Sequence, residues 1–287
     1  MKVSVVIPTY YRVEELSELF NSLLNETVKP FEVIVVDDTP DDTIRALCET
    51  YKAAFENVGS ELIYIKNSRM RSLTISRNLG VKLARGELIM FLDSDVVLYP
   101  DYVEKICHVF MNYPALGVQG WIVPNKDKSK LDFFSQILNK LFFLDRSSKN
   151  SCKFHEYPSV LTKIINCERL SGANMTYKRE VFNEFAFDEN MKKYCYMEDV
   201  LFSYLIYKKH PKGLFITPYA KCVHKESKTA RMEDQELKEI KNRHRKYVLI
   251  KLFGLKGWFL YYWQGIGIKI KTMGKTFLNL FRRGEVT

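Results

Sequence analysis

Two aspartates one residue apart, Asp93 and Asp95, follow the apolar run 87–92. Carboxylate oxygens are the ligands that Mg²⁺ and Mn²⁺ prefer, and these ions commonly share them with the phosphates of a substrate. Alternate side chains of a strand lie on one face, so both carboxylates can point to the same cleft. Taken alone, such a pair is more often an acidic turn that ends a strand. The rest of the chain must decide between the two interpretations.

The first 125 residues alternate between strand and helix patterns. Residues 3–8 form a continuous apolar run, typical of a parallel strand that is covered on both faces. The alternation predicts an α/β fold with a mostly parallel, doubly wound sheet and helices on both faces. The expected strands are 3–8, 31–36, 62–65, 87–92 and 117–123, and the expected helices are 13–24, 42–55, 72–84 and 100–111.

Polar side chains follow three of these strands. They are Thr9 and Tyr10, then Asp37 and Asp38, then the segment 93–95. Each set alone has a turn-forming explanation. Ligands of doubly wound sheets bind at the carboxyl ends of the strands, so three polar sets on one rim predict a binding site.

Ordered motifs extend over about residues 3–225. In chain order they are VSVVIPTYYR, VIVVDD, SRNLGVKLARGELIMFLDSD, RLSGANMTYKREVF, MEDVLFSYLI and VHKES. The set resembles the family 2 glycosyltransferases, inverting enzymes of the GT-A fold that use nucleotide-sugar donors. Each motif alone is unspecific, but the ordered set is specific. The resemblance implies a GT-A catalytic domain at 1–237, with a nucleotide-sugar-binding half at 1–125 and an acceptor-binding half at 126–237.

The resemblance assigns the nucleotide pocket to the ends of the strands. Carboxylates suit this use because they accept hydrogen bonds from a uracil N–H or from ribose hydroxyls. Arg77 suits a charge-assisted contact to the donor or to Asp93, although an exposed helix residue is the plainer interpretation. The positions implied for the donor, besides Arg77 and Asp93, are Pro8, Thr9, Tyr10, Arg12, Asp37, Asp38, Ser94 and Gly172.

A divalent metal site is implied at Asp93, Asp95 and His224, with Asp95 as the expected direct ligand. Mn²⁺ or Mg²⁺ there would bridge the two phosphates of the donor and neutralise the charge of the departing nucleoside diphosphate. For His224, a partly buried histidine at the end of a strand is an equally good interpretation.

Glu198 and Asp199 precede an expected helix at 200–209, so N-capping is a structural alternative for either carboxylate. The resemblance makes Asp199 the general base that deprotonates the acceptor hydroxyl, with Glu198 beside it in the motif. One base and an in-line attack give a single displacement with inversion. Gly172 in the SGAN segment allows a close approach of the backbone.

The excess positive charge lies in the last fifty residues. Residues 238–287 carry 12 Lys and Arg against 2 Asp and Glu, whereas the first 237 residues carry 32 of each. Apolar and aromatic residues concentrate at 247–270, but charged residues interrupt them, so a membrane-spanning helix is not expected. The pattern favours a helical, basic and amphipathic segment on an anionic membrane surface. A helical extension packed on the catalytic domain or on a second protomer is the alternative.

The compartment expected from the sequence is the cytoplasm, at the inner face of the cell membrane. No signal peptide is apparent, and the six cysteines are scattered without a zinc-binding spacing. The first 237 residues carry no net charge and contain no recognition motif, so nucleic acid is not an expected partner.

The function expected from these features is transfer of a sugar from a nucleoside diphosphate, with uridine favoured, to a hydroxyl of a glycan or a lipid-linked glycan. A polyprenyl-phosphate sugar synthase and a non-catalytic nucleotide-binding scaffold are the alternatives. A nucleotidyltransferase would normally have a glycine-rich loop after the first strand, where this chain has Pro-Thr-Tyr-Tyr.

Overall fold

The computed structural model describes residues 1–287 apart from 125–132, 145, 150, 228, 230–233 and 283–287. The predicted boundary between residues 125 and 126 therefore lies outside the described residues. The strands of the main sheet are β1 (Val3–Thr9), β2 (Glu32–Asp37), β3 (Glu61–Lys66), β4 (Leu88–Phe91), β5 (Val96–Leu98), β6 (Gly117–Ile122), β9 (Ile165–Asn166), β10 (Met175–Lys178) and β11 (Leu214–His224).

The helices are α1 (Val13–Leu24), α2 (Thr43–Asn57), α3 (Leu73–Leu83), α4 (Tyr102–Asn112), α5 (Phe133–Leu141), α6 (Glu198–Lys209), α7 (Asp234–Phe253) and α8 (Leu255–Arg282), with a short 3-10 turn η1 (Arg179–Asn183). A separate strand pair is formed by β7 (Arg146–Lys149) and β8 (Glu156–Val160).

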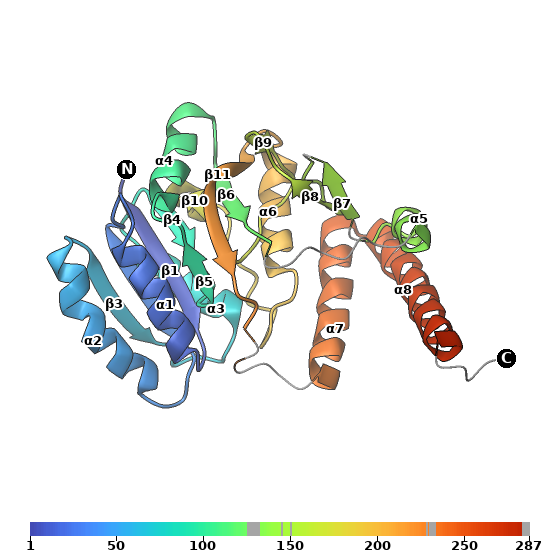
Figure 1. The fold of residues 1–287 in the computed structure, drawn as a ribbon, viewed down its shortest axis with the longest axis horizontal. Helices are drawn as coiled ribbons and strands as arrows, with labels where there is room; N and C mark the ends of the chain where they lie inside the picture. The colour runs from blue at the N-terminus through green and yellow to red at the C-terminus, as the bar shows by residue number, and fades with distance from the viewer. Residues whose placement is uncertain (125–132, 145, 150, 228, 230–233, 283–287) are drawn as a thin grey trace.

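The main sheet is mostly parallel, as the sequence predicts (Figure 1). Its order is β3-β2-β1-β4-β10-β6-β11-β5, with β9 paired to β11. The first four of these strands are parallel, and so are β6 and β11. β10 runs antiparallel to β4 and β6, and β5 runs antiparallel to β11. The α/β alternation predicted for residues 3–123 is confirmed, whereas the short strand β5 was not predicted.

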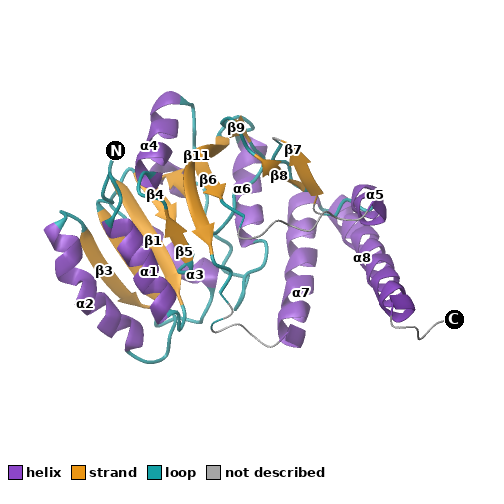
Figure 2. Ribbon diagram, viewed as in Figure 1, coloured by secondary structure: helices purple, strands orange, loops and turns teal. Residues whose placement is uncertain are grey.

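Helices cover both faces of the sheet, so β1, β2 and β4 are buried along their whole length (Figure 2). Alternate side chains of these strands point to opposite faces. On one face Val5 and Val33 pack in one apolar cluster with side chains of α1, α2 and α4. On the other face Val6 and Phe91 pack with side chains of α6 and with the apolar residues of α3. The carboxyl edge of the parallel strands is left for the site.

The C-terminal segment forms two helices at the side of this domain (Figure 1). α7 begins at Asp234, a few residues before the expected boundary at 238. Its Val248, Leu249 and Leu252 pack in one buried cluster with Val200 and other side chains of α6, so this part of the tail packs on the catalytic domain, as the alternative interpretation predicts.

α8 lies against α7 and α5. Gly257 meets the backbone of Leu249 so closely that no side chain would fit between the two helices. Trp263 Nε1 donates a hydrogen bond of 3.0 Å to the carbonyl of Leu141, at the end of α5. Among the described residues, no helix is both long enough and apolar enough to cross a membrane.

Candidate active site

Asp93, Asp95 and His224 come together at the carboxyl edge of the sheet. Asp93 follows β4, Asp95 precedes β5, and His224 is the last residue of β11. The antiparallel pairing of β5 with β11 places His224 opposite Val96, next to Asp95. One potential ligand atom from each of the three side chains lies within 4.8 Å of the other two. His224 Nε2 is 3.2 Å from Asp95 Oδ1 and 3.9 Å from Asp93 Oδ2.

Charges around these three residues shift their pKa values. Burial raises the pKa of Asp95, but the hydrogen bond and charge of His224 and the charge of Arg12, 3.0 Å from Oδ1, outweigh burial and lower it. Burial lowers the pKa of His224, but Asp95 and Asp93 raise it above the ordinary value of histidine. Burial raises the pKa of Asp93, against the opposing charges of Arg77 and His224. The carboxylate oxygens in this arrangement are donors that Mn²⁺ and Mg²⁺ accept, and the imidazole adds one nitrogen donor.

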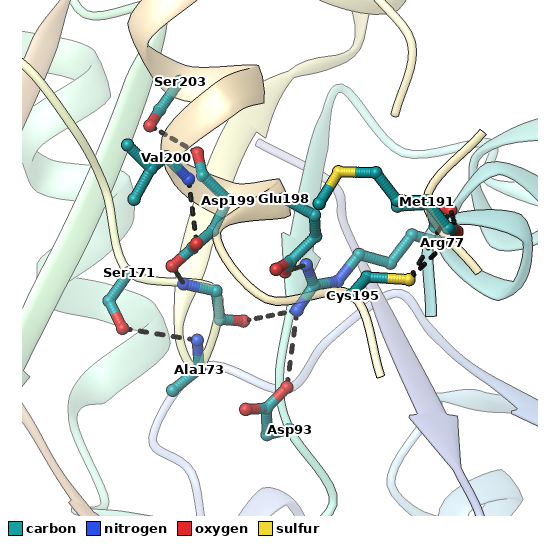
Figure 3. Close-up of polar contacts among 12 residues, drawn as sticks. Arg77, Asp93, Ser171, Ala173, Met191, Cys195, Glu198, Asp199, Val200 and Ser203 are labelled. Carbon is teal, nitrogen blue, oxygen red and sulfur yellow. Dashed lines mark hydrogen bonds and ion pairs between the residues drawn. The ribbon is translucent and has the colours of Figure 1, made fainter. Parts of the chain in front are cut away.

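Arg77 is a buried residue that contacts Glu198, Asp93 and Gly172. Its side chain, on α3, is 1% exposed and forms ion pairs with Glu198 and, at 3.4 Å, with Asp93 (Figure 3). Its Nη2 also donates a hydrogen bond of 2.9 Å to the carbonyl of Gly172. Arg77 is therefore no exposed helix residue, and of its two expected partners it contacts Asp93.

Glu198 and Asp199 occupy the first turn of α6, which begins two residues earlier than expected. Met197 holds the N-cap position with a left-handed φ of 67°, so neither carboxylate is the N-cap residue. Such a backbone conformation is unfavourable for a non-glycine residue and often accompanies functional sites. Burial and the charge of Asp199 raise the pKa of Glu198 to about 8, against the opposing charge of Arg77.

The two carboxylates face different partners. Glu198 faces Arg77, whereas Asp199 accepts hydrogen bonds of 2.8 Å from the backbone N–H of Gly172 and of Val200 (Figure 3). A Cβ at Gly172 would lie 2.9 Å from Arg77 Nη2 and 3.0 Å from Glu198 Oε1. Only glycine leaves room for this approach. Gly172 thus connects two parts of the site. Its carbonyl accepts a hydrogen bond from Arg77, which pairs with Asp93, and its N–H donates one to Asp199 of α6.

The residues expected at the nucleotide lie at the ends of β1 and β2. Asp37 is fully buried and accepts hydrogen bonds from the backbone N–H of Thr39 at 2.7 Å and the hydroxyl of Tyr64 at 2.9 Å. Asp38 accepts hydrogen bonds from Ser76 at 2.7 Å and from Asn67 at 2.5 Å. Hydrogen bonds from protein groups therefore hold both carboxylates in place.

Five further expected residues are at or near this edge. Thr9 and Ser94 are buried, as is Pro8 within β1. The guanidinium carbon of Arg71 lies 3.5 Å from the centre of the Tyr10 ring. Arg12 reaches Asp95 and so connects this edge to the candidate metal site.

A cavity of about 680 Å³ adjoins the candidate metal site and the first turn of α6. Asp93, His224, Glu198 and Asp199 line part of it, and residues of the C-terminal helices line another part. Most binding cavities for small ligands have volumes of this order. The wall residues beyond the carboxylates were not predicted, because the sequence indicated only that the tail is basic and amphipathic.

The sequence model of "Glycosyl transferase family 2" matches residues 4–185. The chain belongs to glycosyl transferase family 2. A curated relative from Haloferax volcanii, a glucosyl-dolichyl phosphate glucuronosyltransferase, is 28% identical over 187 residues, which are 64% of this chain and 55% of the relative. The chain spans about half the length of such curated relatives.

Solved structures agree on the GT-A fold. The mannosyltransferase PcManGT from Pyrobaculum calidifontis, in complex with GDP-Man and Mn²⁺, has a TM-score of 0.60 at 15% identity over 96% of this chain and 75% of its own. S. aureus TarS 1-349 in complex with UDP has a TM-score of 0.54 at 20% identity over 90% of this chain and 68% of its own. The predicted family and fold class are confirmed.

Proposed function

We propose that this member of the family is an inverting glycosyltransferase that moves a sugar from a nucleoside-diphosphate donor, with uridine favoured, to a hydroxyl of a glycan or lipid-linked glycan. The carrying observation is one continuous arrangement. The Asp93, Asp95 and His224 cluster is joined through Arg77 and Gly172 to Asp199, which lines a cavity.

The charges of the site favour a divalent cation. Carboxylates of Asp93, Asp95, Glu198 and Asp199 face two guanidinium groups, those of Arg77 and Arg12. Asp93 and Asp95 offer carboxylate oxygens, and His224 a ring nitrogen, at the place where they would hold Mn²⁺ or Mg²⁺. Such an ion, when bound, supplies charge stabilisation for the departing diphosphate.

Asp199 acts on the acceptor in this proposal. Its two backbone hydrogen bonds fix the carboxylate at the cavity, where it takes the proton of an acceptor hydroxyl. The hydroxyl oxygen attacks the anomeric carbon while the bond from that carbon to the diphosphate breaks, so the configuration inverts. Arg77 positions Glu198 and Asp93 and keeps the two halves of the site together.

Donor binding tests the proposal. UDP, GDP, dTDP and their sugars are compared by thermal shift with Mn²⁺ or Mg²⁺, and again with chelator. One diphosphate should raise the Tm by roughly 5 °C at a hundredfold excess over its Kd. The rise should disappear with chelator and in Asp95→Ala, but persist in the exposed control Glu49→Ala. If no nucleotide raises the Tm, the proposal is wrong and the scaffold alternative gains support.

We also propose that α8 holds the protein on the cytoplasmic face of an anionic membrane. Its outward side carries Leu255, Phe259, Tyr262, Ile266 and Met273, spaced three, four or seven residues apart and all exposed. Phe259 is 65% and Met273 72% exposed. Such a stripe, with aromatic rings and nearby lysines, suits the membrane interface.

Sedimentation with vesicles tests this contact. Phe259→Glu and Ile266→Glu should each weaken binding to anionic vesicles about 10- to 100-fold, since each removes roughly 1.5–3 kcal/mol of apolar burial. Met111→Glu is the matched control, because Met111 is 64% exposed on α4, away from α8. Equal vesicle binding by all variants would contradict the proposal, and a dimer that the two α8 variants disrupt would indicate a second protomer instead.

A further inference from the structure

The cavity beside Asp199 extends well beyond the catalytic carboxylates. Part of its wall is built by the C-terminal helices, with Leu249 from α7 and with Gln264 and Ile268 from α8. These α8 residues lie on the side of the helix opposite the exposed apolar stripe, since 264, 268 and 271 follow one another at helical spacing. One helix therefore presents an inner face to the cavity and an outer face to the surroundings.

The charged residues that line the cavity fall into two groups. Among the described lining residues, every acidic side chain belongs to the catalytic group: Asp93, Glu198 and Asp199. Beyond that group the charged lining residues are basic. Arg169 comes from the segment between β9 and β10, Arg245 from α7 and Lys271 from α8. Three separate elements thus bring positive charge to one cavity.

Two of these cations are held in place by contacts with Asn139 and Tyr261. Lys271 Nζ donates a hydrogen bond of 2.6 Å to Oδ1 of Asn139, a buried residue of α5. The guanidinium carbon of Arg245 lies 5.0 Å from the centre of the Tyr261 ring. Oriented cations bind an anionic group at a smaller entropic cost than freely moving ones.

Resting on the proposed glycosyl transfer, we propose that the acceptor carries a phosphate group, which Arg169, Arg245 and Lys271 bind while its hydroxyl lies at Asp199. Two guanidinium forks and one ammonium group offer donors in several directions, which suits the several oxygens of a phosphate. Leu249 and Ile268 line the same wall and contact the apolar parts of the acceptor.

The test compares acceptors with and without phosphate, using the full chain and the donor found by thermal shift. One arm is a soluble glycerol-phosphate oligomer, the other a short-chain polyprenyl diphosphate sugar, each beside its phosphate-free counterpart. We expect a KM about tenfold lower for the phosphate-bearing member of at least one pair. The arm that shows the effect identifies the source of the phosphate, a free glycan or a lipid-linked one.

Variants on the cavity wall connect this preference to the named cations. Arg245→Gln and Lys271→Gln should each raise the KM of the phosphate-bearing acceptor about tenfold, with little change in kcat. The matched controls are Arg243→Gln and Lys269→Gln, two residues away on the same helices and exposed. A residue two positions away points to a different side of an α-helix. Calorimetry of acceptor binding in the presence of nucleoside diphosphate and Mn²⁺ gives a readout without turnover.

The two proposals fail differently. Equal KM values for acceptors with and without phosphate, or wall variants that behave as their controls, would overturn the phosphate inference while donor binding stands. A preference for carboxylate-bearing acceptors would overturn it as well. Absence of metal-dependent donor binding would overturn the proposed function itself, and the inference with it.

Discussion

Asp199→Asn should lower kcat by about 10²–10⁴-fold, because an amide cannot take the proton of the acceptor hydroxyl. The loss should appear with glycan acceptors and with water as the acceptor, measured as release of nucleoside diphosphate. The thermal shift produced by donor and metal should stay, since Asp199 lies on α6 and the candidate metal ligands lie at the edge of the sheet.

Asp199→Asn should also lower the stability of the fold, apart from its effect on catalysis. Asp199 accepts one hydrogen bond at each oxygen, from Gly172 and from Val200. Asparagine keeps a single acceptor oxygen, so one of these N–H groups loses its partner at a cost of about 1–3 kcal/mol. Thermal unfolding separates that cost from the change in kcat.

Unchanged turnover in Asp199→Asn would contradict the base assignment. It would favour the polyprenyl-phosphate sugar synthase, because a phosphate nucleophile is already ionised and needs no strong base. This outcome differs from the acceptor inferred above, in which the phosphate only binds and a hydroxyl still attacks. The variant therefore distinguishes a phosphate that reacts from one that positions the acceptor.

The nucleotide-side half of the fold could be predicted from local patterns. Strands β1, β2 and β4 are short apolar runs buried on both faces, and α1 has the bounds that its apolar stripe predicts. Each of these signals lies within about a dozen residues of sequence. The resemblance added the residue types of the site, but only the structure gives their distances.

Long-range pairing could not be predicted from such signals. β5 has three residues, Val96–Leu98, and its partner β11 lies more than a hundred residues further along the chain. That pairing places His224 beside Asp95. The burial of Arg77 was missed for a related reason, because its partners Glu198 and Gly172 come from distant segments.

The inner face of α8 could have been predicted from the spacing of its residues. Gln264, Ile268 and Lys271 interrupt or flank the apolar residues at helical spacing, on the side opposite Phe259 and Ile266. Resolving the tail into two helical faces would have predicted one side for the protein and one for the surroundings. Composition alone describes the tail as basic and apolar, which favours a membrane surface and leaves packing on the protein as the alternative.

Arg77→Met should destabilise the protein by about 3–5 kcal/mol, because it removes the cation from two carboxylates in a buried site. Methionine fills much of the same space between Phe91 and Phe187, whose ring centres lie 5.9 and 5.4 Å from the guanidinium carbon. The cost is therefore mainly electrostatic. The measurement is the free energy of unfolding in denaturant, at several pH values and with chelator present.

The sign of the pH dependence follows from Glu198. Burial already raises its pKa to about 8 in the parent, and without Arg77 the pKa rises further. An acid whose pKa is higher in the folded than in the unfolded state contributes stability that is complete at low pH and lost as pH rises through the folded pKa. The difference in the free energy of unfolding between parent and variant should widen above pH of about 8, by up to roughly 1.4 kcal/mol per pH unit.

A second substitution decides whether charge is the cause. If the cost of Arg77→Met comes from the unpaired carboxylate, adding Glu198→Gln should recover most of the loss that appears above pH of about 8. Arg69→Met is the matched control, because Arg69 pairs with Glu189 at 2.5 Å on the surface, where the two side chains are 46% and 33% exposed. Its loss should cost within about 1 kcal/mol. A gap that stays constant with pH, or a double variant no more stable than Arg77→Met, would mean that packing rather than charge makes Arg77 necessary at the centre of the site.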